Sequence, residues 1–436
     1  MSLLPETGRR VHEIAVRAQA AGRVPSLVLA VVRDRALLHF VGAGVHPRPD
    51  PKTQYRLGSI TKTMTATMVL QLRDEGFVNL DDLLYRHLPG TPVGGVTLRQ
   101  LLGHVSGLQR EPDGAWWERN PGSGVDQLLA ELAFDKLSGP PFQTFHYSNL
   151  GYGLLGAVLQ RVTGETWASL VGKRVLDPLG MKRTTYSPVE PFARGYVVHP
   201  LHGSLHEEPR LDAGAMAPAG QLWSTVTDMV KWAAFLADPA PAVLSRQTVD
   251  EMCAPVVVTD DAWTAGHGLG PQLFRVGERV FAGHGGSMPG YAAQLLVHRP
   301  SRTGVIAFAN AYGLRGTHIR QVALDALAAV LDAEPESVEP WRPAAAPEGD
   351  AAELCGRWWW MGREYEMTAD GADLVMTCLT ADGDRWRFVR EARDRWRGRS
   401  GMNDGEILRV LRSPDGGVDR LDIATFLFSR DPGQLG

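Results

Sequence analysis

The sequence Tyr55-Arg56-Leu57-Gly58-Ser59-Ile60-Thr61-Lys62 contains the only Ser-x-x-Lys pattern in the 436-residue chain. Apolar residues then recur at a spacing of four from Ile60 to Leu72, which predicts a helix that begins at Ser59 and ends at Gly76. Residues i and i+3 share a helix face, so the Lys62 ammonium would lie beside the Ser59 hydroxyl. The positive end of the helix would also lie close to an oxyanion formed there. The pattern indicates a nucleophilic serine, with an N-capping serine and a solvated lysine as the alternative.

The segments on either side of this stretch predict an α+β domain. Strand-like runs are expected at 26–34, 36–43, 291–298 and 304–311, and a closing helix is expected at 320–331. Residues 97–180 are mostly helical in pattern, and residues 196–220, rich in His, Pro and Gly, are typical of a long loop. Strands at both ends with helices between them predict a domain at 1–335, into which a helical lobe at about 96–220 is inserted.

The composition changes near the end of this domain. Repeated Pro, Ala and Glu residues predict a linker at 336–350. Short strand-like runs follow at 364–368, 374–377 and 385–390. They are separated by Asp-Gly turns at Asp370 and Asp382. We therefore expect a small all-β, barrel-like domain at 351–436.

Two further motifs contain residues that suit acyl transfer. Tyr147-Ser148-Asn149 stands before a helical pattern, where Tyr147 could act as a base if a cation such as Lys62 favoured its phenolate. The Asn149 amide could hold a substrate carbonyl or orient the lysine. Gly283-His284-Gly285-Gly286-Ser287 precedes the strand expected at 291–298, and its glycines would let a backbone N–H approach a ligand closely. Taken singly, each motif also fits a helix cap or a glycine-rich turn.

In this order, the three motifs resemble those of the serine β-lactamase and penicillin-binding-protein superfamily. The class C branch, with its family VIII esterases, D-aminopeptidases and D-Ala-D-Ala carboxypeptidases, is the most similar. The resemblance runs from about Val24 to Leu331 and includes residues 98–108 and 218–225. It implies a β-lactamase/transpeptidase-like antiparallel sheet flanked by helices.

The resemblance also implies a role for each site residue. Ser59 would be the nucleophile, Lys62 its proton partner, and Tyr147 the general base and then the acid. Asn149 would be a polar positioning group, and the His284 imidazole could polarise the phenol or shuttle a proton.

The backbone of the third motif would complete the site. The N–H groups of Ser59 and Ser287 would form the oxyanion hole, with Gly286 allowing the strand to approach the substrate. β-Lactamases have Lys-Thr-Gly where this chain has His-Gly-Gly, and Gly285 offers no hydroxyl to a substrate carboxylate. Turnover of β-lactams or of D-Ala-D-Ala termini is therefore in doubt.

These residues predict a serine hydrolase that forms an acyl-enzyme. We expect an esterase or amidase that acts on small esters or on D-amino-acid amides and peptides. A β-lactamase or D,D-carboxypeptidase is the second enzyme hypothesis, and a catalytically silent binding protein on the same scaffold is an alternative of another class.

Composition limits the other possibilities. Apolar residues make up 44% of the chain and charged residues 22%, with a formal net charge of −4, so we expect a soluble protein that does not bind nucleic acid. No apolar stretch approaches the roughly 20 residues of a membrane span. The start of the chain lacks a secretory pattern, which predicts a cytoplasmic protein, and nothing indicates an oligomeric state.

No cofactor or metal is expected. Gly151-Tyr152-Gly153-Leu154-Leu155-Gly156 fits a dinucleotide fingerprint, but its glycines fall inside an expected helix and follow no buried strand. The histidines at 199, 202 and 206 lack the accompanying Cys or His-Glu-x-x-His residues of a metal site. The three cysteines form no short pair, so neither a disulfide framework nor a zinc site is predicted.

Overall fold

The computed structural model of the chain describes residues 2–44, 48–335, 343, 346–347, 350–380 and 384–433. Contacts divide the chain into two compact units, at 1–337 and 338–436. Most of the linker predicted at 336–350, and the turn predicted at Asp382, lie outside the described residues. No helix in the described part of the chain has the length and apolar character needed to cross a membrane.

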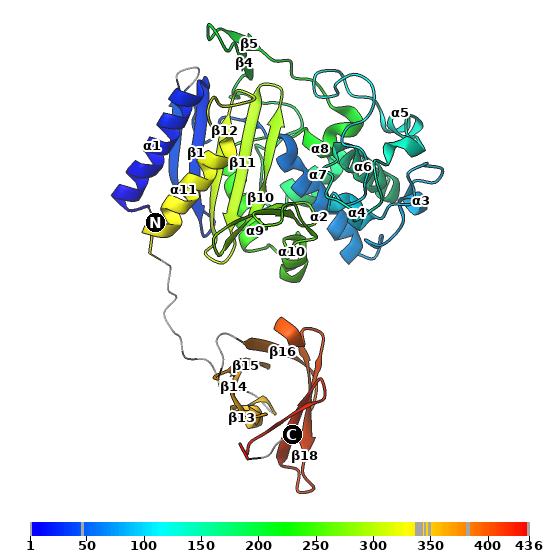
Figure 1. The fold of residues 1–436 in the computed structure, drawn as a ribbon, viewed down its shortest axis with the longest axis vertical. Coiled ribbons are helices and arrows are strands. Elements are labelled where there is room, and N and C mark those ends of the chain that lie inside the picture. Colours follow the sequence, from blue (N-terminus) through cyan, green and yellow to red (C-terminus); the bar gives the residue numbers. More distant parts are fainter. Residues whose placement is uncertain are drawn as a thin grey trace. The chain divides into compact units, whose positions relative to one another are not determined.

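The first unit is built on an eight-stranded sheet with the order β2-β1-β12-β11-β10-β9-β8-β7 (Figure 1). Its strands are β1 (Ser26–Arg33), β2 (Ala36–Gly44), β7 (Val257–Val258), β8 (Ala265–His267), β9 (Gln272–Val276), β10 (Arg279–Met288), β11 (Tyr291–His298) and β12 (Thr303–Ala309). All pairs given for this sheet are antiparallel. The predicted α+β fold is confirmed.

The two faces of the sheet are covered by different helices. Helices α1 (Pro5–Gly22) and α11 (Ile319–Ala333) lie together on one face (Figure 1). Alternate residues of β1 point to opposite faces, so Leu29 packs with these two helices, whereas Ala30 packs with the helices of the other face. Burial on both faces explains why β1 is a continuous apolar run in the sequence.

The other face carries the helix that follows Ser59 and the helical lobe. A 3₁₀ turn, η1 (Gly58–Ile60), leads into α2 (Thr61–Asp74), which is buried for most of its length. The remaining helices on this side are α3 (Leu84–His87), α4 (Leu98–Leu102), α5 (Val125–Ala130), α6 (Asn149–Thr163), α7 (Trp167–Val171), α8 (Ala217–Gly220), α9 (Val226–Ala237) and α10 (Arg246–Met252). Ser148 caps α6 through its hydroxyl, and Gly164 ends it in the left-handed conformation.

One prediction for this unit needs correction. The segment 196–220 is not a plain loop, because it forms the hairpin of β4 (Tyr196–Val198) and β5 (Leu205–Glu207) and then α8. Polar and glycine residues masked these elements, since a three-residue strand has too few positions to show alternation. The third motif directly precedes β11, as expected, and it lies within β10 rather than in the glycine-rich turn that was the alternative.

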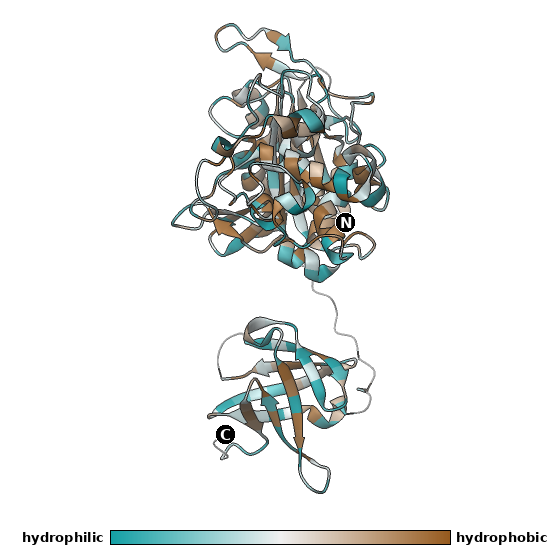
Figure 2. Ribbon diagram, turned by 90° about the vertical axis from the view of Figure 1, so that its right-hand side faces the viewer, coloured by the Kyte–Doolittle hydropathy of each residue, from teal (hydrophilic) through white to brown (hydrophobic). Residues whose placement is uncertain are grey.

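The second unit is a closed barrel of eight antiparallel strands, as predicted. A short helix, α12 (Ala351–Leu354), precedes β13 (Gly356–Trp360), β14 (Arg363–Asp370), β15 (Asp373–Cys378), β16 (Arg385–Ala392), β17 (Arg395–Gly398), β18 (Ile407–Arg412), β19 (Val418–Ile423) and β20 (Phe426–Ser429). Apolar and polar segments alternate along its strands, and the inward set forms a separate core (Figure 2).

Candidate active site

Two glycines bring the Ser59 turn against the backbone of β10. Gly58 has a φ of +54°, and a methyl group placed there would lie 2.5 Å from the Ser287 nitrogen. A methyl group at Gly286 would lie 1.9 Å from the Leu57 carbonyl oxygen. The two segments therefore meet backbone to backbone, with no space for a side chain between them.

Lys62 lies one helical turn beyond Ser59, and the two side chains meet as the sequence predicts. The Lys62 Nζ atom is 2.9 Å from Ser59 Oγ and donates a 2.6 Å hydrogen bond to the Ala219 carbonyl of α8. The lysine is fully buried, and burial lowers its pKa to about 7, with opposing contributions from Glu111 and Glu118. A neutral amine, which can accept a proton, is therefore accessible near neutral pH.

Tyr147 lies just before α6 and faces the same two residues. Its phenol is hydrogen-bonded to the Ser59 hydroxyl, and the Lys62 nitrogen is 5.1 Å from the centre of its ring. Burial raises the pKa of Tyr147 well above its ordinary value, although the bond to Ser59 opposes this shift. The phenol therefore keeps its proton at neutral pH in the resting site.

Asn149 is the first residue of α6, and its amide is held by a carboxylate that the motif did not indicate. Its Nδ2 atom donates to both oxygens of Glu111, at 2.7 and 3.0 Å, while Trp117 donates to the same carboxylate at 2.8 Å. The buried Asn149 Oδ1 has no hydrogen-bond partner among the described residues. This oxygen remains available to a substrate N–H.

His284 occupies the interior of the site on β10. Its ring centre is 6.1 Å from that of Tyr147, and its Nδ1 atom contacts the Gly285 carbonyl, so the proton belongs on Nδ1. Burial, reinforced by His267 and Lys62, holds the pKa of His284 well below its ordinary value. The imidazole is therefore neutral, and no described residue pairs with its Nε2 atom.

His104 supports Tyr147 from the opposite side. Its ring stacks on the phenol with the centroids 4.3 Å apart, and its Nδ1 atom accepts a 3.0 Å hydrogen bond from the Ser148 N–H. The residue has a φ of +57°, and burial holds the pKa of its ring well below the ordinary value. His267 packs edge-on against His104 at 5.0 Å. This contact could not be predicted from the sequence, although His104 lies in the segment 98–108 that resembles the family.

A pair of carboxylates from the helical lobe interacts with Lys62. Besides Glu111, the partly buried Glu118 interacts with Lys62 and with the buried Arg56. Burial, together with repulsion from Glu111, raises the pKa of Glu118 to about 7. The guanidinium of Arg110 lies 5.8 Å from the centre of the Tyr147 ring, on the exposed side. No motif marked these three charged residues, because only the fold brings them to the site.

The predicted residues thus form one connected cluster. Ser59 contacts Lys62 and Tyr147 directly, Tyr147 faces His284, and Asn149 joins the cluster through Glu111. Among the described residues, no group of three or more His, Cys, Asp or Glu side chains could hold a metal ion.

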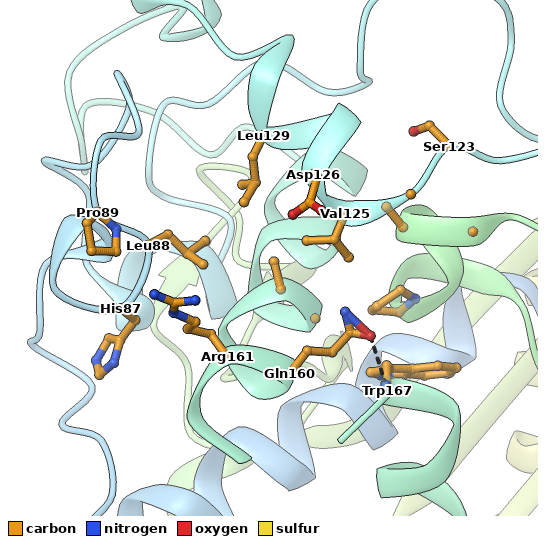
Figure 3. Close-up of a pocket in the computed structure, with 16 residues that line it drawn as sticks. His87, Leu88, Pro89, Ser123, Val125, Asp126, Leu129, Gln160, Arg161 and Trp167 are labelled. Atoms are coloured by element: carbon orange, nitrogen blue, oxygen red, sulfur yellow. Dashed lines mark hydrogen bonds between the residues drawn. The ribbon is translucent and has the colours of Figure 1, made fainter. Parts of the chain in front are cut away.

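A separate cavity of about 730 Å³ lies in the helical lobe and contains none of the predicted catalytic residues (Figure 3). Its wall includes Trp167, whose indole N–H donates to Thr65, and Pro218, whose carbonyl accepts from the same hydroxyl. Ala219, the next residue after Pro218, accepts the bond from Lys62. The cavity is therefore divided from Ser59 and Lys62 by α8 and α2.

Comparisons with known proteins identify the family of the chain. The model of the family described as "Beta-lactamase" matches residues 11–329, and that of "Domain of unknown function (DUF7586)" matches residues 347–430. The chain is 29% identical over 328 residues to "Beta-lactamase-like protein 2" of Dictyostelium discoideum, covering 70% of this chain and 59% of the relative. It is 33% identical over 206 residues to "D-alanyl-D-alanine-carboxypeptidase/endopeptidase AmpH" of Escherichia coli, covering 43% of this chain and 50% of the relative.

Solved structures give the same result. A D-stereospecific amidohydrolase from Streptomyces sp. is 27% identical with a TM-score of 0.64, covering 73% of this chain and 98% of that chain. The fold and its relatives thus define a hydrolase of the serine β-lactamase and penicillin-binding-protein type. The chain belongs to the beta-lactamase family.

Proposed function

We propose that this hydrolase forms an acyl-enzyme on Ser59, with Lys62 as the base that accepts its proton. The observation that carries this proposal is the 2.9 Å contact between the two side chains, with burial holding the lysine pKa at about 7. A base whose pKa lies near the working pH is unprotonated in a large enough fraction of molecules and still binds a proton strongly enough to accept it from the serine. Because Tyr147 stays protonated, the pKa directions favour Lys62 over Tyr147 as the first proton acceptor.

The steps follow from these proton positions. Ser59 Oγ attacks the substrate carbonyl carbon while its proton passes to the Lys62 amine. The N–H groups of Ser59 and Ser287 would stabilise the oxyanion. When the tetrahedral intermediate collapses, the Tyr147 phenol protonates the leaving group and regains a proton from the Lys62 ammonium. Water then attacks the carbonyl carbon of the acyl-enzyme ester and gives a proton to the same pair of residues. The pair passes that proton to Ser59 Oγ as the carboxylic acid product leaves.

The carboxylates of Glu111 and Glu118 indicate the substrate class. Both interact electrostatically with Lys62, and Glu111 holds the amide of Asn149. A substrate ammonium group near them would be attracted, and it would keep Glu118 ionised by opposing the repulsion from Glu111. We infer that the substrates are amides, esters or short peptides of amino acids with a free α-ammonium group. The similarity to the D-stereospecific amidohydrolase supports the D-configuration.

A matched pair of substrates tests this inference. D-Ala-p-nitroanilide and its N-acetyl derivative differ only in the ammonium group, so kcat/KM should be at least ~10-fold higher for the free amine. Glu118→Gln should reduce this preference, whereas Glu131→Gln, which changes an exposed carboxylate at the end of α5, should leave it intact. Equal rates for the two substrates, or faster hydrolysis of the acetylated one, would contradict the assignment.

Turnover of β-lactams or D-Ala-D-Ala peptides is the second candidate. It is supported by Arg110, a cation beside Tyr147, and by the similarity to the carboxypeptidase/endopeptidase. The neutral His284 and the absent hydroxyl at Gly285 oppose it, because neither holds a carboxylate. A chromogenic cephalosporin, assayed beside the anilides, distinguishes the two. Efficient cephalosporin turnover that is lost in Arg110→Gln would establish the second candidate.

A further inference from the structure

The two ends of the C-terminal barrel differ in how they are closed. At one end α12 closes the barrel, because Leu354 is fully buried in the barrel core and accepts a hydrogen bond from the Trp358 indole. An ion pair joins Glu353 to Arg412 at this end. At the opposite end, where β13 joins β14 and β19 joins β20, the described residues form only a 3₁₀ turn, η5 (Gly401–Asn403), and no α-helix. We call this end the barrel mouth.

A cavity of about 430 Å³ opens at the barrel mouth. Aromatic rings form much of its wall, contributed by Trp360, Tyr365, Trp386, Phe426 and Phe428. The ring centres of Trp360 and Phe426 are 4.8 Å apart, and those of Tyr365 and Phe428 are 5.1 Å apart. Such a volume lies within the range of small-molecule sites, which also occur in the mouths of eight-stranded barrels.

Apolar side chains are left in solvent around the same opening. Met361 is 63% exposed and Met402 is 69% exposed, and both line the cavity. Of the five large apolar side chains exposed in the described part of the barrel, only Leu411 lies at the closed end. Exposed apolar patches of this kind mark binding sites, and methionine sulfur makes favourable contacts with aromatic rings.

A polar side chain inside the cavity lacks a partner. Asn403 lines the cavity and is 3% exposed, yet its side-chain amide forms no hydrogen bond with any described residue. Its amide atoms are not sealed from solvent, so a molecule that occupies the cavity can reach them. A ligand that carries an amide or carbonyl group could supply the missing hydrogen bond.

We propose that the barrel mouth is a binding site for a small aromatic molecule that carries an amide or carbonyl group. The aromatic walls would stack on its ring, and Asn403 would pair with its polar group. The site belongs to the second unit and uses none of the residues of the proposed catalytic cluster. The binding-site proposal is therefore independent of the proposed hydrolase function, and either one can fail without the other.

Binding of 2-naphthamide to the full-length Ser59→Ala chain tests the proposal. Titration calorimetry should give one saturable equivalent, and cyclohexanecarboxamide, which has no aromatic ring, should bind at least ~10-fold more weakly. Trp360→Ala should weaken 2-naphthamide binding at least ~10-fold. Trp359→Ala is the matched control, because the adjacent tryptophan points to the other face of β13.

A second variant covers the case in which Trp360→Ala disturbs the barrel. Met402→Trp enlarges an exposed side chain at the opening and should block the ligand while the thermal unfolding curve stays unchanged. Absence of saturable binding, or binding that neither variant weakens, would overturn the proposal. So would a molecular mass that rises with concentration and falls back in Met402→Glu, since the barrel mouth would then be an interface between copies of the chain.

Discussion

Replacing Glu111 with glutamine perturbs the charge that most favours the protonated form of Lys62. Burial lowers the pKa of Lys62 to about 7, and Glu111 is the largest of the contributions that raise it. Glutamine keeps the size of the side chain and an oxygen that can accept from Asn149. The pKa of Lys62 should therefore fall in Glu111→Gln, and the neutral base should become available at lower pH.

The expected change follows from the fraction of neutral lysine. Loss of one interacting charge shifts a pKa by about one unit, equivalent to ~1.4 kcal/mol. For a pKa of about 7, roughly a tenth of Lys62 is neutral near pH 6, and for a pKa of about 6 roughly half is neutral. The rate should rise about fivefold near pH 6 and change by less than about twofold near pH 8.

The assay is the pH dependence of kcat/KM for p-nitrophenyl acetate. This ester has no ammonium group, so the change in lysine pKa is separated from any loss of substrate attraction. Glu131→Gln controls for the loss of one negative charge elsewhere in the lobe. A midpoint that does not move in Glu111→Gln, or that moves to higher pH, would refute the assignment of Lys62 as the base.

Two further substitutions test the geometry of the cluster. Tyr147→Phe keeps the ring and its stacking on His104 but removes the phenol proton, so kcat should fall by about 10² or more. Near-normal turnover of D-Ala-p-nitroanilide would exclude the proton-transfer role of Tyr147. Gly286→Ala places a methyl group 1.9 Å from the Leu57 carbonyl oxygen and should lower kcat/KM by about 10². Gly95→Ala is the control, because a methyl group there meets nothing within 4 Å, and equal effects of the two substitutions in steady-state kinetics would rule out the close approach of β10.

The sequence predicted those parts of the site that are encoded locally. The pairing of Ser59 with Lys62 depends only on a spacing of three in a helix, and the end of α6 depends on Gly164. The strands β1 and β11 were visible because both their faces are buried, which makes their sequences continuous apolar runs.

The remaining site residues could not be predicted because the fold brings them together over long distances in the chain. His104 and His267 are 163 positions apart, yet their rings are in contact. Glu111 lies in a loop without regular structure, and nothing in its local sequence shows that it holds Asn149. The helix α1 was missed because only a few of its residues are apolar and buried.

The central claim is that Ser59 becomes covalently acylated, and intact-mass spectrometry of the full-length chain treated with a fluorophosphonate tests it most directly. The wild-type chain should gain the mass of one phosphonyl group, located on Ser59 after proteolysis. Ser59→Ala should gain none while retaining its circular dichroism spectrum, since only one hydroxyl is lost at the start of a helix. An adduct on another residue, or the same mass gain in Ser59→Ala, would contradict the account.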